Sequence, residues 1–309
     1  FPPISMNKVG STGTFARRSI SVSFGSEIAA TRRRLRNLPE FLRYFFRLCF
    51  LWFQSYRPVS FDPRSNVIVS LTSFPARIDQ AWIAIESIFQ QDYRPWKVTL
   101  VLSEDEFPSR KLPRQIRRQQ ERGLEIIWTQ RNIKSYKKLL PTRNRHPDAT
   151  IITADDDLCY KAWCVRKLVE ASQRMPGVII GHRGWVVTTC KKELVPYVDW
   201  APADPDTPPE CCFLTGGAGT LYPPHVLPLD TLLDIDSALE LCPSADDVWF
   251  WAVARYAKVP TYCLGNNSYV AVRSLRGTPA LYTNNTNGGQ NDFQIRAVLR
   301  KYFSNISLP

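Results

Sequence analysis

The stretch "TIITADDD" (residues 150–157) runs from apolar and β-branched residues directly into three aspartates. Neighbouring carboxylates repel one another, and the end of a strand offers nothing that compensates for this repulsion. Two explanations are open: a solvated Asp-rich turn, or a site where a bound cation supplies positive charge.

The segments before this stretch alternate between two periodicities. Residues 79–91 and 135–146 have helical spacing, and four apolar runs predict strands: "NVIVSLT" (66–72), "KVTLVLS" (97–103), "LEIIWT" (124–129) and "TIITA" (150–154). This alternation predicts an α/β fold with a mostly parallel, doubly wound sheet. Ligands bind in such sheets at the carboxyl ends of strands, near the point where the strand order reverses. The aspartates follow such an end, which favours a binding site over a turn.

The spacing of the aspartates predicts a metal site. Side chains two apart on an extended segment point the same way, so Asp155 and Asp157 can face one ligand while Asp156 turns aside. Two carboxylates suit Mn²⁺ or Mg²⁺, which usually complete their coordination with phosphate oxygens of a substrate. Such an ion would neutralise the charge of a departing nucleotide diphosphate.

The composition is that of a globular protein with a buried core. The chain has 309 residues, of which 44% are hydrophobic and 22% charged. Its eight cysteines include no C-x-x-C pair, so we expect no zinc site and reduced, buried thiols, as in cytoplasmic proteins. Three N-x-S/T triplets would fit a secreted protein, but such triplets often arise by chance.

The positive charge is concentrated at the N-terminus. Residues 1–60 contain ten Lys or Arg against two Glu, and so carry +8 of the formal net charge of +12. We expect a flexible basic arm with an amphipathic helix over residues 1–60, followed by a catalytic domain over residues 61–309. The helix, within residues 32–57, has a narrow polar stripe and a broad aromatic face.

The pattern of this helix indicates which kind of surface the arm binds. Its continuous apolar run, residues 48–53, is far shorter than the roughly 20 residues that span a bilayer. A basic helix with an aromatic face suits the surface of an anionic membrane. The alternative is a helix that packs on its own domain or on a dimer mate.

Six stretches carry a resemblance to a known family: "VIVSLTSFPARI" (67–78), "ESIFQQDYRPWKVTLVLSEDEFP" (86–108), "SYKKLLP" (135–141), "TADDDLCY" (153–160), "TGGAGTLYPP" (215–224) and "CPSADDVWF" (242–250). In this order they resemble nucleotide-diphospho-sugar glycosyltransferases of the GT-A fold, especially bacterial enzymes that build polysaccharides and glycoconjugates. The resemblance covers about residues 65–295. It implies a single catalytic domain, a nucleotide sugar as donor, and a glycan or lipid-linked glycan as acceptor.

The resemblance places the nucleotide across the ends of the first strands. Thr72, Ser73 and Arg77 would then border the base and ribose, with Glu104 at the end of the next strand. The alternatives are a solvated charge for Arg77 and, for Thr72 and Ser73, capping of the following helix.

The diphosphate would lie beside the aspartates. Lys137 and Lys138 precede the aspartate strand, where an ammonium can meet phosphate, although one of the two is expected to be only a solvated helix charge. Asp155 and Asp157 would hold the metal, with Asp157 the more direct ligand, and Asp156 is grouped with the donor-binding residues.

Three further segments carry weaker signals of binding, and for the third, residues 283–292, the alternative is a plain surface loop. Gly216 and Gly217 would form the floor of the sugar pocket, or else a β-bulge. His182 and Arg183 would contact the acceptor or the diphosphate, unless the histidine is simply buried. The polar loop 283–292 would close over the donor, with Asn291 or Asp292 completing the diphosphate site.

The catalytic base is expected at the start of a helix. In inverting members of the family an acidic pair at a helix start supplies a general base, which implies Asp247 in preference to Asp246. The alternative is structural, because Ser244 as N-cap and Asp247 three residues later resemble a capping box.

Other classes fit the chain less well. A sugar-nucleotide pyrophosphorylase would carry a Gly-rich, basic loop where this chain has "TSFPARI", and a haloacid-dehalogenase phosphatase would have Thr or Val where it has Cys159. A nucleic-acid-binding protein would not segregate its basic charge in an arm. The sequence therefore predicts a metal-dependent, inverting glycosyltransferase at the cytoplasmic face of a membrane, with no nucleic-acid partner.

Overall fold

The computed structural model describes residues 38–191, 193–272 and 289–302. Contacts divide the chain into two compact units, Phe1–Phe50 and Leu51–Pro309. Residues 32–37 of the expected basic helix and residues 283–288 of the polar loop lie outside the described residues. The division into an arm and a catalytic domain at residue 60 stays a prediction.

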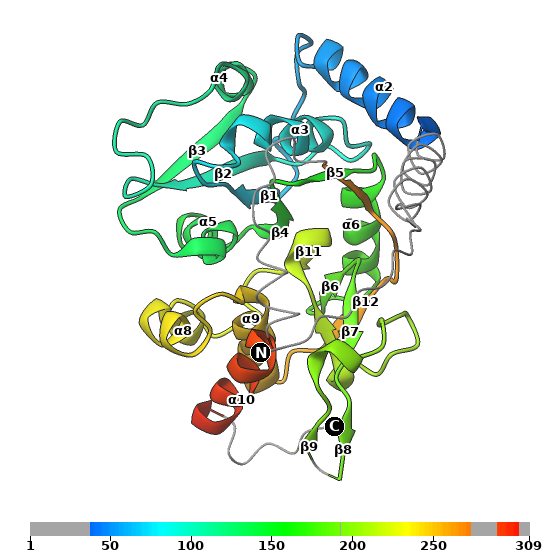
Figure 1. The fold of residues 1–309 in the computed structure, drawn as a ribbon, viewed down its shortest axis with the longest axis vertical. Helices are drawn as coiled ribbons and strands as arrows, with labels where there is room; N and C mark the ends of the chain where they lie inside the picture. Colours follow the sequence, from blue (N-terminus) through cyan, green and yellow to red (C-terminus); the bar gives the residue numbers. More distant parts are fainter. Residues whose placement is uncertain (1–37, 192, 273–288, 303–309) are drawn as a thin grey trace, which may run out of the picture. The chain divides into compact units, whose positions relative to one another are not determined.

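A seven-stranded sheet forms the centre of the second unit (Figure 1). Its strand order is β12-β6-β11-β4-β1-β2-β3, and only β11 runs antiparallel to its neighbours. The strands are β1 (Val67–Thr72), β2 (Lys97–Ser103), β3 (Leu124–Thr129), β4 (Thr150–Asp155), β6 (Ile179–Gly181), β11 (Thr220–Tyr222) and β12 (Thr261–Cys263). The predicted α/β fold with a mostly parallel sheet is confirmed.

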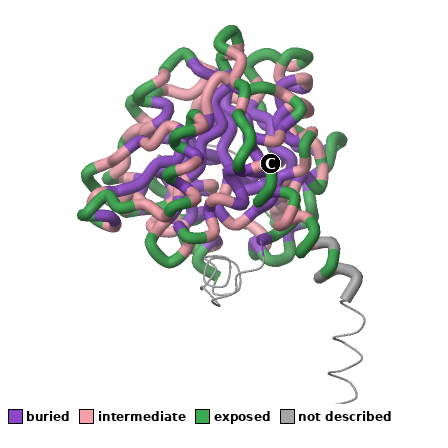
Figure 2. The backbone as a smooth tube through the Cα atoms, turned by 90° about the horizontal axis from the view of Figure 1, so that it is seen from above, coloured by how far each residue is buried: buried purple, intermediate pink, exposed green. Residues whose placement is uncertain are grey.

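The strands are apolar on both faces because both faces are covered. Ile151 belongs to one buried cluster with the helix α9 (Asp246–Tyr256), and its neighbour Ile152 belongs to another with α3 (Ile78–Phe89). Successive side chains of a strand point to opposite faces, so the two clusters cover opposite sides of the sheet. In Figure 2 the buried residues gather in the middle of the second unit.

The remaining elements surround this sheet. The helices are α2 (Leu38–Gln54), α4 (Arg114–Glu121), α5 (Leu140–Arg145), α6 (Cys164–Arg174), α7 (Leu229–Leu232), α8 (Ile235–Leu241) and α10 (Gln290–Tyr302). Short 3-10 helices are η1 (Lys134–Lys138), η2 (Tyr197–Asp199), η3 (Pro209–Cys211) and η4 (Gly216–Ala218). Pairs of short strands are β5 (Leu158–Tyr160) with β13 (Tyr269–Ala271), β7 (Gly184–Val186) with β10 (Cys212–Leu214), and β8 (Thr189–Cys190) with β9 (Glu193–Leu194).

The helix expected over residues 135–146 is divided in two. A 3-10 turn, η1, ends at Lys138, and α5 begins at Leu140 with Pro141 in its first turn. Proline has no N–H to donate, so it suits the start of a new helix and not the interior of a continuous one. The break matters for the site because it fixes Lys137 and Lys138 on a tight turn.

The last turn of α2 belongs to the second unit. Leu51 is buried, and the rings of Trp52 and Trp82 pack edge to face at 6.1 Å. Arg122 donates to the carbonyl oxygens of Gln54 and Arg57 at 3.1 and 2.7 Å. Among the described residues, no helix is long and apolar enough to span a membrane.

Candidate active site

The carboxyl ends of β1 and β4 lie side by side, with Thr72 paired to Asp155. The sheet reverses its order here, since β2 and β3 follow on one side and β4 and β11 on the other. A cavity of about 850 Å³ opens at this point. Its charged lining residues are Arg77, Lys134, Lys137, Lys138, Arg183, Glu106, Asp155, Asp156, Asp157, Asp246 and Asp247.

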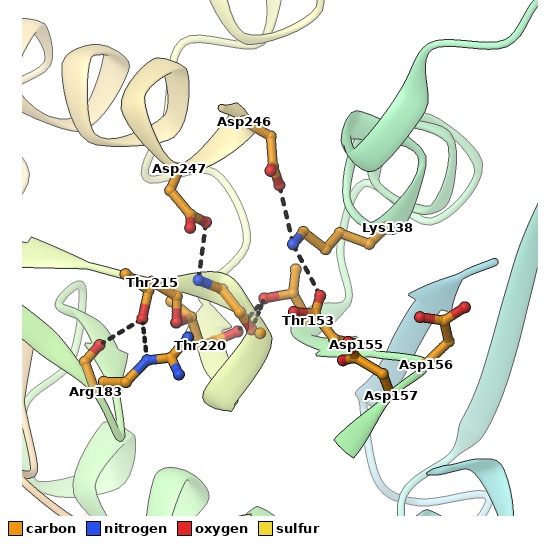
Figure 3. Close-up of polar contacts among 12 residues, drawn as sticks. Lys138, Thr153, Asp155, Asp156, Asp157, Arg183, Thr215, Thr220, Asp246 and Asp247 are labelled. Atoms are coloured by element: carbon orange, nitrogen blue, oxygen red, sulfur yellow. Dashed lines mark hydrogen bonds and ion pairs between the residues drawn. The ribbon is translucent and has the colours of Figure 1, made fainter. Parts of the chain in front are cut away.

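Lys138 joins two acidic groups across the cavity. Its Nζ lies 3.1 Å from Asp155 Oδ1 and 3.1 Å from Asp246 Oδ2 (Figure 3). Burial by itself would lower the pKa of Lys138, but the surrounding carboxylates, led by Asp155 and Asp246, raise it well above the ordinary value. Lys138 is therefore a permanent positive charge between the strand end and α9.

The expectation that one of the two lysines is a solvated charge was wrong. Lys137 and Lys138 are both buried, and Lys137 forms an ion pair with Glu106. Both lysines line the cavity from the turn of η1, and each ammonium group is paired with a carboxylate: Lys137 with Glu106, and Lys138 with Asp155 and Asp246.

Asp156 and Asp157 form hydrogen bonds and ion pairs with the loop that joins β1 to α3. Ser73 Oγ donates to Asp156 Oδ2 at 2.5 Å, and Arg77 Nη1 lies 3.2 Å from Asp156 Oδ1 and 2.8 Å from Asp157 Oδ2. Figure 3 shows Asp156 pointing away from Lys138. Asp156 and Asp157 lie in a turn after β4 and share Arg77, so the alternation expected of an extended segment does not apply to them. Burial raises the pKa of Asp156 to about 6, against the Ser73 hydrogen bond and Arg77. Arg77 is therefore a partner of the aspartates and not a solvated charge.

Thr72 and Ser73 do not cap the helix that follows them. The N-cap residue of α3 is Arg77, with no side-chain hydrogen bond to the helix. Thr72 Oγ1 donates instead to the carbonyl oxygen of Val101 on β2 at 2.8 Å. Both residues line the cavity.

Asp155 and Asp157 fit a divalent cation in part. Burial and the Asp155 charge raise the pKa of Asp157, with Arg77 opposing, so the two carboxylates repel each other. Burial would also raise the pKa of Asp155, but Lys138, Arg183 and Arg77 lower it below its ordinary value. Over the described ranges, no three His, Cys, Asp or Glu side chains are grouped to hold a metal. Two carboxylates suit an ion that takes its other ligands from phosphate and water.

The turn η4, which contains Gly216 and Gly217, contacts the carboxylates of Asp155 and Asp247. A Cβ on Gly217 would lie 1.9 Å from Asp155 Oδ2, so a larger residue would displace Asp155. The Gly216 N–H donates to Asp247 Oδ1 at 2.8 Å. Tyr160 Oη accepts from the Asp155 N–H at 2.7 Å and donates to the Gly217 carbonyl at 2.5 Å. Neither glycine lines the cavity, so the turn braces two acids and does not form a pocket floor.

The first turn of α9 is capped from another helix. The N-cap residue is Ala245, without a side-chain cap, and Gln294 Oε1 of α10 accepts from the N–H groups of Ser244 and Ala245 at 3.0 and 3.1 Å. The capping-box alternative for Asp247 is therefore wrong. Asp247 is free to reach toward the glycine turn because Gln294 satisfies the backbone at the helix start.

The Asp247 carboxyl has the pKa of a base that works near neutrality. Burial, followed by the negative charge of Asp246, raises its pKa to about 7, against the opposing influence of Lys138 and the Gly216 N–H. A carboxylate with this pKa can accept a proton from a bound hydroxyl at physiological pH.

Some predicted residues lie outside the cavity or have other partners. Glu104 is not a lining residue and forms an ion pair with Arg110. His182 is also absent from the lining: it is buried, its Nε2 lies 2.9 Å from the Cys164 carbonyl oxygen, and burial lowers its pKa to about 4. Asp292 accepts from the Tyr197 N–H at 2.8 Å.

The neighbours of His182 and Asp292 in the sequence, Arg183 and Asn291, do line the cavity. Arg183 lines it and donates to Thr215 Oγ1 at 2.7 Å and to Tyr269 Oη at 2.5 Å. Asn291 also lines it. Each segment therefore contributes one of the two neighbouring residues that the sequence suggested.

An aromatic wall was not predicted. Trp185, Tyr197, Trp200 and Phe213 line the same cavity and pack on one another. They come from β7, η2, the segment after η2, and β10. Isolated aromatic residues in a sequence are typical of a core, so only the assembled fold identifies this wall.

Comparisons with known proteins give distant similarities. No family model matches the chain, and no curated protein matches it. The structure is similar to a mannosyltransferase, PcManGT from Pyrobaculum calidifontis, solved with GDP-Man and Mn²⁺, at 17% identity and a TM-score of 0.47, covering 86% of this chain and 74% of that one.

Two other solved structures are similar. S. aureus TarS 1–349 has 11% identity and a TM-score of 0.41, over 67% of this chain and 60% of that one. A 4-diphosphocytidyl-2C-methyl-D-erythritol synthase has 11% identity and a TM-score of 0.39, over 76% of this chain and 99% of that one. The function of the chain is therefore inferred from its own site.

Proposed function

We propose that the protein is a metal-dependent glycosyltransferase of the GT-A type, which moves a sugar from a nucleotide-diphosphate donor to a hydroxyl of a polysaccharide or lipid-linked glycan. One observation carries the proposal: a single cavity holds a pair of aspartates at a strand end and, across the Lys138 ammonium, a carboxyl whose pKa is raised to about 7. The first group suits a diphosphate with its metal, and the second suits a general base.

Charge supports a metal in the donor site. Five basic and six acidic side chains line the cavity, so a diphosphate would enter a site that is already slightly negative. Asp155 and Asp157 would hold Mn²⁺ or Mg²⁺, which when bound neutralises the charge of the departing diphosphate. Lys138 and Arg183 lie close enough to Asp155 to lower its pKa, and their charges would add to this stabilisation.

The nucleotide would lie over the end of β1. Thr72, Ser73 and Arg77 line the cavity there, and Arg77 is already oriented by its pairing with two aspartates. Glu104 is left out of this assignment because it faces Arg110.

Asp247 would act as the base of an inverting reaction. The acceptor hydroxyl gives its proton to the carboxylate of Asp247, its oxygen bonds to the anomeric carbon, and the bond from that carbon to the diphosphate breaks. The Gly216 N–H holds Oδ1, so Oδ2 is the atom that would receive the proton. Asp246 keeps Lys138 in place and raises the pKa of Asp247.

The helix α2 supports a membrane-surface role for residues 32–57. Its exposed side chains include Phe46 at 66% and Phe53 at 72% exposure, together with Leu42, Phe45, Phe50 and Trp52. Exposed aromatic residues in a basic segment suit an anionic bilayer surface. The enzyme would then work at the cytoplasmic face, where lipid-linked acceptors are anchored.

A donor screen tests the proposed function. Nucleotide sugars are incubated with the protein and Mn²⁺ or Mg²⁺, with and without chelator, and release of nucleoside diphosphate is measured. A parallel arm with nucleoside triphosphates and sugar phosphates measures pyrophosphate. Pyrophosphate release in place of nucleoside diphosphate would establish a nucleotidyltransferase and overturn the proposal.

Asp157→Asn provides the matched variant for the metal. The Asp157 side chain is 40% exposed, so the fold should tolerate the change. We expect divalent-dependent donor turnover to be lost and the melting temperature to stay close to that of the wild type. Full turnover in this variant would remove the metal role from Asp157.

A further inference from the structure

The two ends of the cavity differ in chemistry. The cavity is lined both by the aspartates with Arg77, Lys137 and Lys138 and by four aromatic rings that pack on one another, Trp185, Tyr197, Trp200 and Phe213, with Val198; we call this second group the aromatic end. Thr215, Asp246 and Asp247 also line the same cavity. A ligand at the aromatic end would thus share one cavity with the base and with a bound donor.

The aromatic end is rigid before any ligand arrives. The Tyr197 ring packs against Trp185, Trp200 and Phe213 with centroid distances of 6.2, 5.1 and 5.8 Å. Trp200 Nε1 donates to the Val195 carbonyl at 2.9 Å, and Asp292 holds the Tyr197 N–H. Tyr197, Trp200 and Phe213 are buried, whereas Trp185 is half-buried. Trp185 is therefore the ring that offers surface to a ligand, on a preorganised support.

Asn291 supplies a polar group at the cavity wall. Its residue is only 8% exposed, and it lines the cavity. Its side-chain amide is not among the buried polar atoms of the described residues that lack a partner, so it does not by itself require a ligand. A ligand with a polar edge in this cavity can nevertheless hydrogen-bond to it.

We propose that the aromatic end is the acceptor subsite and binds a pyranose ring of a glycoside. The ring lays its C–H face on Trp185, one hydroxyl bonds to the Asn291 amide, and the reacting hydroxyl reaches Asp247. A pyranose matches this end because it has an apolar face and a polar edge. An acyl or polyprenyl chain would cover Trp185 but form no hydrogen bond with Asn291. The assignment rests on the proposed function, since it takes Asp247 as the base.

The test measures binding of sugars without donor turnover. The full-length protein is mixed with methyl pyranosides of glucose, galactose, mannose and N-acetylglucosamine, and saturation-transfer NMR reports the affinity of each. We expect at least one to bind, and Trp185→Ala and Asn291→Ala to weaken it about tenfold or more. Trp185→Phe should restore most of the affinity, because it keeps an aromatic face.

Trp128→Ala is the matched control, since Trp128 is a half-buried indole outside the cavity. It should leave sugar binding unchanged, and melting curves of all variants verify folding. The assignment is overturned if no methyl glycoside binds the wild type, if Trp185→Ala binds as well as the wild type, or if only a prenyl phosphate binds. Glycoside binding that depends on Trp185, without turnover of any donor, would overturn the glycosyltransferase proposal and with it the acceptor role, and would leave a pyranose-binding site at the aromatic end.

Discussion

Asp247 combines its proposed role as base with a cost to stability. Its pKa in the folded protein is about 7, well above that of an aspartate in the unfolded chain. The folded state therefore prefers the protonated form, and stability decreases as pH rises from about 4 to about 7, where Asp247 ionises. Above pH 7 the protein carries this cost in full, with Asp246 close by.

Asp247→Asn should separate the two effects. Transfer to an acceptor should fall by ~10²–10⁴, because the base is lost. The melting temperature at pH 8 should rise, and this gain should shrink as pH falls from 7 to 4. In the wild type, kcat/KM should increase through a midpoint near pH 7. Near-normal transfer by the variant would remove the role of base from Asp247.

Gly217 is required by the position of Asp155. Gly217→Ala would place a Cβ 1.9 Å from Asp155 Oδ2 and should displace that carboxylate. We expect weaker divalent-dependent donor binding, by about as much as in Asp155→Ala. The double variant should be no worse than either single variant, because both changes remove the same group. Calorimetric titration of donor and metal measures this, and additive losses would contradict it.

At the scale of elements, Arg122 joins three helices. It pairs with the fully buried Glu86 of α3 at 2.6 Å, closes the end of α4, and donates to two carbonyl oxygens at the end of α2. A buried carboxylate that loses its partner is strongly destabilising. Together with the packing of Trp52 on Trp82, Arg122 therefore attaches the last turn of α2 to the rest of the second unit.

Arg122→Met should lower the free energy of unfolding by ~3–5 kcal/mol, since Glu86 would be left buried and charged. Adding Glu86→Gln should recover part of this loss, because the buried charge is removed. The control is Arg166→Ala, which breaks exposed pairs with Asp92 and Glu170 and should lower the free energy of unfolding far less. Urea denaturation measures all four proteins. Equal losses for the Arg122 and Arg166 variants would refute the account.

At the scale of the whole molecule, the contacts predict where the arm can be removed. The boundary between the two units falls at Phe50 and Leu51, and Leu51 and Ser55 are buried in the second unit. A protein lacking residues 1–50 should keep its melting temperature. A protein lacking residues 1–57 should melt lower, because Arg122 and Trp82 lose their contacts with the end of α2.

The same truncations test the membrane role. The full-length protein should bind anionic vesicles, with salt weakening the binding, since each basic residue at such a surface contributes ~1 kcal/mol that ions screen. Removal of residues 1–50 should abolish this binding and leave donor hydrolysis intact. Vesicle binding that survives the truncation would show that residues 1–50 do not attach the protein to membranes.

The sequence by itself determined the elements and the place of the site. Strands β1 to β4 fall within one residue of the predicted runs, because apolar β-branched segments between polar turns have few other conformations. A parallel sheet aligns the carboxyl ends of its strands, so the aspartates could be assigned to a ligand-binding edge without a structure, whereas the pairing of Arg77 with Asp156 and Asp157 could not.

Only the tertiary structure decided which side chains meet across the cavity. Lys138 contacts Asp246 more than a hundred residues later, Gln294 caps α9, and the aromatic wall draws on segments that are distant in the chain. Local patterns report the periodicity of one segment, whereas such contacts depend on how several segments pack. For the same reason Glu104 and His182, which were predicted to lie in the site, are outside the cavity, because the packing of their neighbours gave each another partner.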